Sequence, residues 1–158
     1  MEELLAEKIW RKVGMEQSAY YTVDALGIAF SGGGLNAGLR DMARLGELIR
    51  NQGKWHGQQI LPTQALKSIA QEGSREAFAR SPYINMKGWS YRAMWWHTGN
   101  EHGAFAARGV HGQTIYIDPK AEMVLVRFAS YPVAANGAND PTSLPAYHEV
   151  AKYLLTKP

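Results

Sequence analysis

Two hydrophobic periodicities divide the chain. Before about residue 88, apolar positions recur every three or four residues, which is the spacing of one helix face. This spacing predicts helices over residues 4–13, 37–51 and 63–70. From Trp89 onward the period falls to two, which predicts strands. A helical pattern returns over residues 144–155.

The residues that end and begin helices agree with this division. Gly14 is placed to end the first helix, and Asn36 and Thr63 are placed to cap the second and third. The first helix has no such cap, so we expect either a frayed N-terminus or a chain cut from a longer one. Residues 18–35 and 72–88 have loop compositions and are predicted to be irregular.

Four segments have strand patterns: residues 89–97, 104–110, 113–118 and 123–129. The middle two alternatively form one long strand that bends at its glycines. The triplet Asp118-Pro119-Lys120 has the composition of a hairpin turn before the last strand. A loop of small residues, 134–140, then leads to the final helix. Helices followed by about three antiparallel strands and a closing helix predict an α+β fold in one domain, residues 1–158.

Aromatic residues crowd the first of these strand segments. If residues 89–97 form one strand, alternation places Trp89, Tyr91 and Trp95 on one face and Trp96 on the other. The first face is expected to pack in the core. Trp96 is then the better candidate for lining a cleft.

Composition excludes several classes of protein. The chain has 158 residues, no cysteine and a net charge of +3, from 17 basic and 14 acidic residues. Without cysteine there is no disulfide scaffold, thiolate zinc site, iron–sulfur cluster or cysteine nucleophile. Basic residues are scattered, so no nucleic-acid partner is predicted. No apolar run reaches the roughly 18 residues that span a bilayer, and no signal-peptide pattern is present, so no membrane partner is predicted.

Candidate sites for nucleotides, metals and an activated serine lack the patterns that these chemistries need. The run Ser31-Gly32-Gly33-Gly34 does not match a phosphate-binding loop, because no Lys-Ser or Lys-Thr pair follows. No serine has a lysine three residues later. The spacing of three histidines matches no standard ligand set, and two others lie further away, so we predict no metal site. The three are His97, His102 and His111, and the outliers are His56 and His148.

Four segments resemble a known family, and they occur in the family's order. The segment GGGLNAGLRDMARLG (residues 32–46), followed by GQQILP (57–62), resembles the class C β-lactamase-related serine hydrolases. Upstream, IWRKVGM (9–15) resembles another element of the same family. Downstream, ARGVHGQTIYIDP (107–119) is similar to a strand of the 6-aminohexanoate-dimer hydrolase and esterase branch.

This resemblance implies a partial β-lactamase/transpeptidase-like fold and an acyl-transfer reaction on a small amide or ester substrate. In the family, the attacking serine of a Ser-x-x-Lys motif and the tyrosine that assists it both precede the segment at residues 9–15. The chain is therefore expected to be the C-terminal part of such a hydrolase and inactive alone, unless an N-terminal partner polypeptide supplies the nucleophile. The alternative is a non-catalytic binding or interaction module on the same scaffold.

The resemblance also assigns site residues. The family's Lys-Thr-Gly element aligns with Ala107-Arg108-Gly109 rather than with His97-Thr98-Gly99, because the residues that follow keep the family spacing. The backbone N–H of Val110 is then one donor to the oxyanion. The substrate-binding residues implied are Asn36, Trp96, Arg108 and Gly109, and no cofactor is needed.

One expectation concerns association. In the complete fold, further strands would join the sheet, so the strand over residues 104–110 is expected to lack a neighbour here. A bare apolar edge invites pairing with a second copy. We therefore expect self-association through this strand or through uncovered helix faces.

Overall fold

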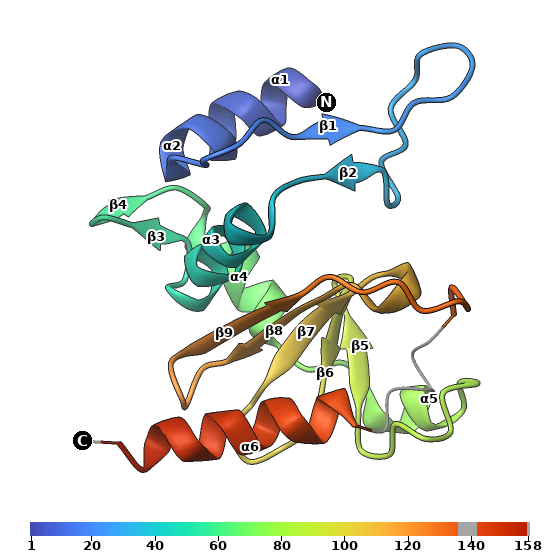
Figure 1. Cartoon of the computed structure of the whole chain (residues 1–158). Helices are drawn as coiled ribbons and strands as arrows, with labels where there is room; N and C mark the ends of the chain where they lie inside the picture. Colours follow the sequence, from blue (N-terminus) through green and yellow to red (C-terminus); the bar gives the residue numbers. More distant parts are fainter. Residues whose placement is uncertain (136–141, 158) are drawn as a thin grey trace.

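A five-stranded antiparallel sheet forms the centre of the molecule (Figure 1). The computed structural model describes residues 1–135 and 142–157. The strand order follows the chain, so the sheet is a simple meander. Its strands are β5 (Ser90–Arg92), β6 (Trp95–His97), β7 (Phe105–Arg108), β8 (Thr114–Asp118) and β9 (Met123–Arg127).

Helices cover both faces of this sheet, and each face has its own core. Alternation along β7 and β8 sends Phe105 and Ile117 to one face, and Ala106 and Tyr116 to the other. On the first face pack α3 (Leu39–Arg50) and α4 (Thr63–Ala70), through Ile49 and Leu66 among others. On the second face packs α6 (Ser143–Leu155), through Tyr147 and Ala151.

Close packing of α3 on the sheet depends on a glycine. A Cβ atom built on Gly46 would lie 2.5 Å from Val124 Cγ1 and 3.0 Å from Ile115 Cγ2. Val124 lies in β9 and Ile115 in β8, so the helix backbone approaches both strands directly. A glycine is therefore needed at position 46, because a larger side chain would collide with the sheet.

The N-terminal segments lie beyond α3, away from the sheet (Figure 1). The opening helix consists of α1 (Glu2–Leu5), a π-helical turn, η1 (Ala6–Trp10), and α2 (Arg11–Val13), and it ends at Gly14 in the left-handed conformation. Beyond it, β1 (Tyr20–Tyr21) pairs with β2 (Leu35–Asn36) across a protruding hairpin.

Four shorter elements complete the described chain. Strand β3 (Lys54–Trp55) pairs with β4 (Gln58–Gln59), and α5 (Arg75–Ala79) precedes the large sheet. A 3-10 turn, η2 (Val110–Gly112), joins β7 to β8. Among the described helices, none has the length and apolar character that crossing a membrane requires.

The structure confirms an α+β fold and corrects parts of the predicted sheet. Residues 89–97 form a hairpin instead of one strand, because Ala93 and Met94 take positive φ values of 49° and 68° and turn the chain back. Tyr91 is therefore the cross-strand partner of Trp96 and shares its face, whereas alternation had placed them on opposite faces.

The middle strands also differ from the alternatives considered. The segments over residues 104–118 form two antiparallel strands, β7 and β8, and not one bent strand. Strand β7 lies between β6 and β8, so the expectation that it lacks a neighbour is wrong. The two strands at the edges of the sheet are β5 and β9. The sheet has five strands where about three were predicted, because residues 89–97 form two strands and residues 104–118 also form two.

Local predictions for the helices hold with small shifts. Helix α3 begins after Gly38 and not after Asn36, which instead lies in β2. Helix α4 begins at Thr63, with Pro62 in the capping position, and the short α5 interrupts the predicted loop 72–88. Of the predicted loop 134–140, residues 136–140 lie outside the described chain.

Candidate active-site cavity

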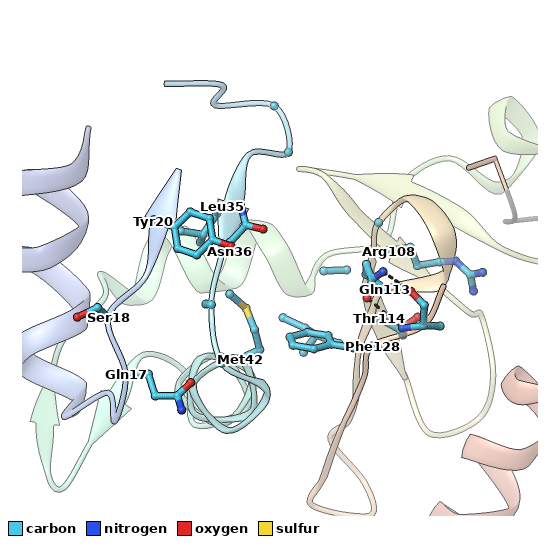
Figure 2. Close-up of a pocket in the computed structure, with 18 residues that line it drawn as sticks. Gln17, Ser18, Tyr20, Leu35, Asn36, Met42, Arg108, Gln113, Thr114 and Phe128 are labelled. Atoms are coloured by element: carbon cyan, nitrogen blue, oxygen red, sulfur yellow. Dashed lines mark hydrogen bonds between the residues drawn. The ribbon is translucent and has the colours of Figure 1, made fainter. Parts of the chain in front are cut away.

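An open cavity of about 810 Å³ lies between the N-terminal segments and the end of the sheet (Figure 2). One wall comes from the glycine-rich segment, β2 and the start of α3, and the other from the corner where β7 passes to β8. Its lining residues are Gln17, Ser18, Tyr20, Gly32, Gly33, Leu35, Asn36, Ala37, Gly38, Met42, Ala107, Arg108, Gly109, Gln113, Thr114, Ile115, Phe128 and Ala129.

The first wall is held in place by hydrogen bonds to the main chain. The side-chain nitrogen of Asn36 donates to the carbonyl of Gly34 at 2.8 Å, which braces the turn before β2. At the start of α3, the buried carboxylate of Asp41 accepts from the backbone nitrogens of Glu16 and Gln17, at 2.7 and 3.1 Å. Asp41 thus joins the segment that carries Gln17 to α3, whose start contributes to this wall.

The second wall is shaped by Gln113. The backbone nitrogen of Gly109 donates to the carbonyl of Gln113 at 2.9 Å. The Gln113 side chain exchanges two hydrogen bonds with the main chain of Ala129, at 2.6 and 3.1 Å, and so extends the strand pairing beyond the end of β9. This pairing holds Phe128 beside the cavity (Figure 2). A Cβ atom on Gly109 would lie 3.1 Å from the Cβ of Gln113, which favours glycine there.

Val110 follows the lining residue Gly109 and is not itself one of the lining residues. It begins the η2 turn directly after Gly109, and 61% of its surface is exposed. The turn is fixed by His111, which takes a φ of 58° and whose Nδ1 lies 2.7 Å from the carbonyl oxygen of Tyr131. The assignment of the Val110 N–H as an oxyanion donor stays a prediction.

The structure brings together three of the predicted site residues. Asn36, Arg108 and Gly109 all line the cavity, with Asn36 and Arg108 on opposite walls (Figure 2). The guanidinium of Arg108 is directed away from Asn36, and its central carbon lies 6.0 Å from the centre of the Trp89 ring. The main chain and the aliphatic part of the Arg108 side chain therefore line the cavity, and its charged guanidinium group is directed away from Asn36.

Trp96 lies elsewhere. Its ring contacts Tyr83, Tyr91 and Phe78, at centroid distances of 4.9, 5.0 and 5.9 Å. This cluster packs α5 and the loop after it onto the outer strands of the sheet. The cavity instead takes its apolar surface from Tyr20, Met42 and Phe128.

Sequence reasoning missed most of these residues. Gln113 lies in the same family-like segment as Gly109, residues 107–119, and this is the only feature of the sequence that could have indicated it. Gln17, Tyr20 and Phe128 reach the cavity through packing of distant segments, and their local sequence patterns do not indicate this.

The chemistry of the cavity is that of a binding surface. Among its described lining residues there is no lysine, histidine, aspartate or glutamate. Ser18 supplies a hydroxyl, but no base from the lining residues accompanies it. The described residues therefore offer amide donors and acceptors and apolar surface, and not a general base or an activated nucleophile.

The histidines considered as metal ligands are separated by the fold. His97 is buried and stacked on Phe105, with a centroid distance of 5.5 Å, and this burial lowers its pKa. His111 fixes the η2 turn at the cavity rim. His102 lies at the other end of β7, where the structure brings it together with Glu101 and with His148, which sequence spacing had set apart.

No protein-family model matches the chain. Its fold is β-lactamase-like: it superposes on the "putative beta-lactamase from Bacteroides dorei DSM 17855" with a TM-score of 0.60, over 98% of this chain and 50% of that one, at 18% identity.

The chain is similar in sequence and structure to proteins named 6-aminohexanoate-dimer hydrolases. It is 40% identical to the "Putative 6-aminohexanoate-dimer hydrolase from Bacillus anthracis", with a TM-score of 0.83 over 98% of this chain and 38% of that one. It is also 34% identical over 131 residues to the curated 6-aminohexanoate-dimer hydrolase of Paenarthrobacter ureafaciens, covering 82% of this chain. The chain spans 33% of that relative's length. The resemblance found in the sequence is confirmed.

Proposed function

We propose that the chain is the C-terminal portion of a serine hydrolase that cleaves a small amide or ester substrate through an acyl-enzyme. The observation that carries the proposal is the cavity itself. Most of its lining residues come from residues 32–42 and 107–115, which belong to two of the segments that resemble the family. Segments far apart in the sequence thus meet around one open space of a size suited to a small molecule.

The proposed reaction is an acyl transfer that passes through a covalent acyl-enzyme. A serine hydroxyl supplied by another polypeptide segment attacks the substrate carbonyl, and a base in that segment takes its proton. The carbonyl oxygen becomes negatively charged, and the N–H of Val110 is one of the donors that stabilise it. Such a donor contributes about 3 kcal/mol to transition-state binding. The base gives this proton to the leaving amine or alcohol as its bond to the carbonyl carbon breaks, and water later releases the acyl group.

Substrate recognition falls to the remaining lining residues. Gly109 leaves space for the reacting carbonyl to approach the strand end. Asn36 offers a side-chain oxygen near the opposite wall, while Met42 and Phe128 provide apolar surface for the acyl chain. Among the described lining residues there is neither lysine, histidine, aspartate nor glutamate to act as a base, and in this proposal an N-terminal partner segment supplies both the nucleophile and its base.

The test compares the chain alone with the chain joined to the N-terminal portion of a relative. The purified chain is expected to show no hydrolysis of a nitrophenyl ester that a serine-directed inhibitor abolishes. A chimera that joins it to the preceding portion of the Bacillus anthracis relative is expected to hydrolyse the ester. In that chimera, Gly109→Val should lower kcat/KM at least about 100-fold by filling the carbonyl site, and Gln64→Ala on exposed α4 should not.

Two outcomes would contradict the proposal. One is inhibitor-sensitive turnover by the purified chain alone at neutral pH. The other is a folded chimera that stays inactive while the parental relative hydrolyses the same ester. The second outcome would favour the alternative, a non-catalytic binding module on this scaffold.

A further inference from the structure

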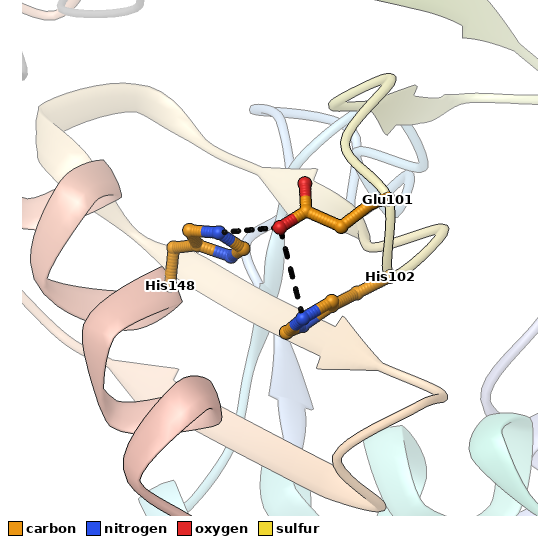
Figure 3. A group of neighbouring side chains, drawn as sticks. All are labelled: Glu101, His102 and His148. Atoms are coloured by element: carbon orange, nitrogen blue, oxygen red, sulfur yellow. Dashed lines mark ion pairs between the residues drawn. The ribbon is translucent and has the colours of Figure 1, made fainter. Parts of the chain in front are cut away.

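Two histidines and a glutamate converge at the end of the sheet opposite to the cavity (Figure 3). Glu101 and His102 lie in the turn between β6 and β7, and His148 lies on α6. Glu101 Oε1 is 3.4 Å from His148 Nε2 and 4.0 Å from His102 Nε2. One potential ligand atom from each residue lies within 4.8 Å of the other two.

His102 is already oriented as metal-binding histidines are. Its Nδ1 lies 2.8 Å from Oδ2 of Asp118, whose side chain is completely buried. The other oxygen of Asp118 accepts from the backbone nitrogen of Ala121 at 3.0 Å, so the carboxylate is held in place. A carboxylate on Nδ1 fixes the proton there and directs the lone pair of Nε2 outward, toward Glu101.

The other two side chains combine access with freedom to adjust. Glu101 is 64% exposed and His148 is 22% exposed at the side chain. The amide of Asn100 lies 3.3 Å from Nδ1 of His148, which is a long contact. Asn100 is itself held, because its side-chain oxygen accepts from the backbone nitrogens of His102 and Ala104. A neutral imidazole that binds a cation through Nε2 carries its proton on Nδ1. Binding at Nε2 of His148 therefore gives up only the long contact between Nδ1 and Asn100.

We propose that Glu101, His102 and His148 bind a first-row transition-metal dication, for which zinc is the natural candidate. Bonds of about 2.0–2.1 Å in a tetrahedral site place ligand atoms about 3.4 Å apart. The present distance from Glu101 to His148 already matches this spacing, and small rotations of these two side chains close the rest. Imidazole nitrogens favour transition metals over calcium and magnesium.

The chemistry of the surroundings supports a dication. The carboxylates of Glu101 and Asp118 together offer two negative charges to the bound ion. The exposed side of Glu101 leaves the fourth position to water. The metal would join α6 to the turn that begins β7, and so it would act as a structural link between the final helix and the sheet. It takes no part in the proposed hydrolysis, because it lies at the opposite end of β7 from the cavity.

The experiment titrates the full chain, freed of metal by a chelator, with Zn²⁺ alone by calorimetry, and records thermal unfolding with and without the ion. We expect one equivalent to bind and the midpoint of unfolding to rise, because an ion that binds only the folded state stabilises it. Co²⁺ should give the visible absorption of a tetrahedral site with nitrogen ligands. Ca²⁺ and Mg²⁺ should produce neither effect.

Variants assign the ligands. Glu101→Gln and His148→Ala change exposed or half-buried side chains, and each should weaken Zn²⁺ binding at least tenfold while the metal-free chain still unfolds cooperatively. His56→Ala, which removes an exposed histidine from the β3–β4 turn, is the matched control and should leave the affinity unchanged. The proposal is overturned if the unmodified chain binds Zn²⁺ no more tightly than the Glu101→Gln and His148→Ala variants, or if His56→Ala causes an equal loss.

Discussion

His97 shows how the surroundings of one residue set its chemistry. Its side chain is buried on the face of the sheet that α3 and α4 cover, and its ring stacks on Phe105. Burial lowers its pKa, and this effect outweighs the attraction of Glu72 and the hydrogen bond to the Ile69 backbone. Among the described residues, no hydrogen-bond partner lies at its Nε2. Burial therefore favours the neutral form of the His97 ring in the folded chain.

This burial predicts a dependence of stability on pH. In the unfolded chain a histidine takes up a proton near pH 6.5, whereas the folded chain resists protonation of His97 until a lower pH. The unfolded state thus binds more protons in this interval, and the free energy of unfolding falls as the pH drops below about 6.5. Urea unfolding at pH 7.5 and pH 5.5 measures the difference.

Two variants isolate the contribution of this histidine. His97→Gln removes the titrating ring and should reduce the stability difference between the two pH values. His56→Gln, at an exposed position, should leave that difference as it is in the unmodified chain. An identical pH dependence in His97→Gln would show that other groups cause it.

At the scale of elements, the segment that follows the opening helix is joined to α3 by polar contacts that centre on one side chain. The buried carboxylate of Asp41 accepts two backbone hydrogen bonds from residues 16 and 17 and contacts Arg44 at 3.3 Å. Arg44 also pairs with Glu16 at 2.5 Å. The first wall of the cavity includes Gln17, so its position depends on this junction.

We predict that Asp41→Ala lowers the free energy of unfolding by about 1–3 kcal/mol, since it leaves backbone donors without their acceptor. Chemical denaturation measures the loss. Asp24→Ala is a matched control: Asp24 also accepts two backbone hydrogen bonds, from Leu26 and Ile28 at 2.9 Å, but in an exposed hairpin where water replaces it. Equal losses in the two variants would contradict the assignment of Asp41 as a buried junction.

At the scale of the whole molecule, exposed apolar surface gathers on the N-terminal hairpin and not on the predicted strand. Strand β7 is paired on both sides, so it offers no edge. The hairpin between β1 and β2 exposes 84% of Leu26, 61% of Ile28 and 60% of Phe30. Clustered exposure of this kind is typical of a surface that another polypeptide covers.

We therefore predict concentration-dependent self-association through this hairpin when the chain is alone. Replacing Leu26, Ile28 and Phe30 together by serine should shift the sedimentation profile toward the monomer. Ile84→Ser, which removes an exposed apolar side chain from another surface, should leave the profile unchanged. A monomer at all concentrations in the unmodified chain would contradict the prediction.

Local patterns predicted the elements well where packing and sequence agree. Helix α3 and the hairpin of β8 and β9 lie where periodicity and the Asp118-Pro119 turn placed them. The prediction failed at Ala93 and Met94, which form a tight turn without the glycine or asparagine that usually signals one. The pairing of β5 with β6 and the packing below it hold this turn, and the turn residues alone do not indicate it.

For the site, the sequence by itself determined the family resemblance and two of the contributing segments, because short motifs keep their residues adjacent in the chain. Only the tertiary structure decided that Asn36 and Gly109 line one cavity and that Trp96 packs elsewhere. It also decided that His148 on α6 lies close to His102, which precedes β7. These outcomes depend on contacts between residues distant in sequence. Periodicity fixes which face of an element is apolar, but not which other element will cover it.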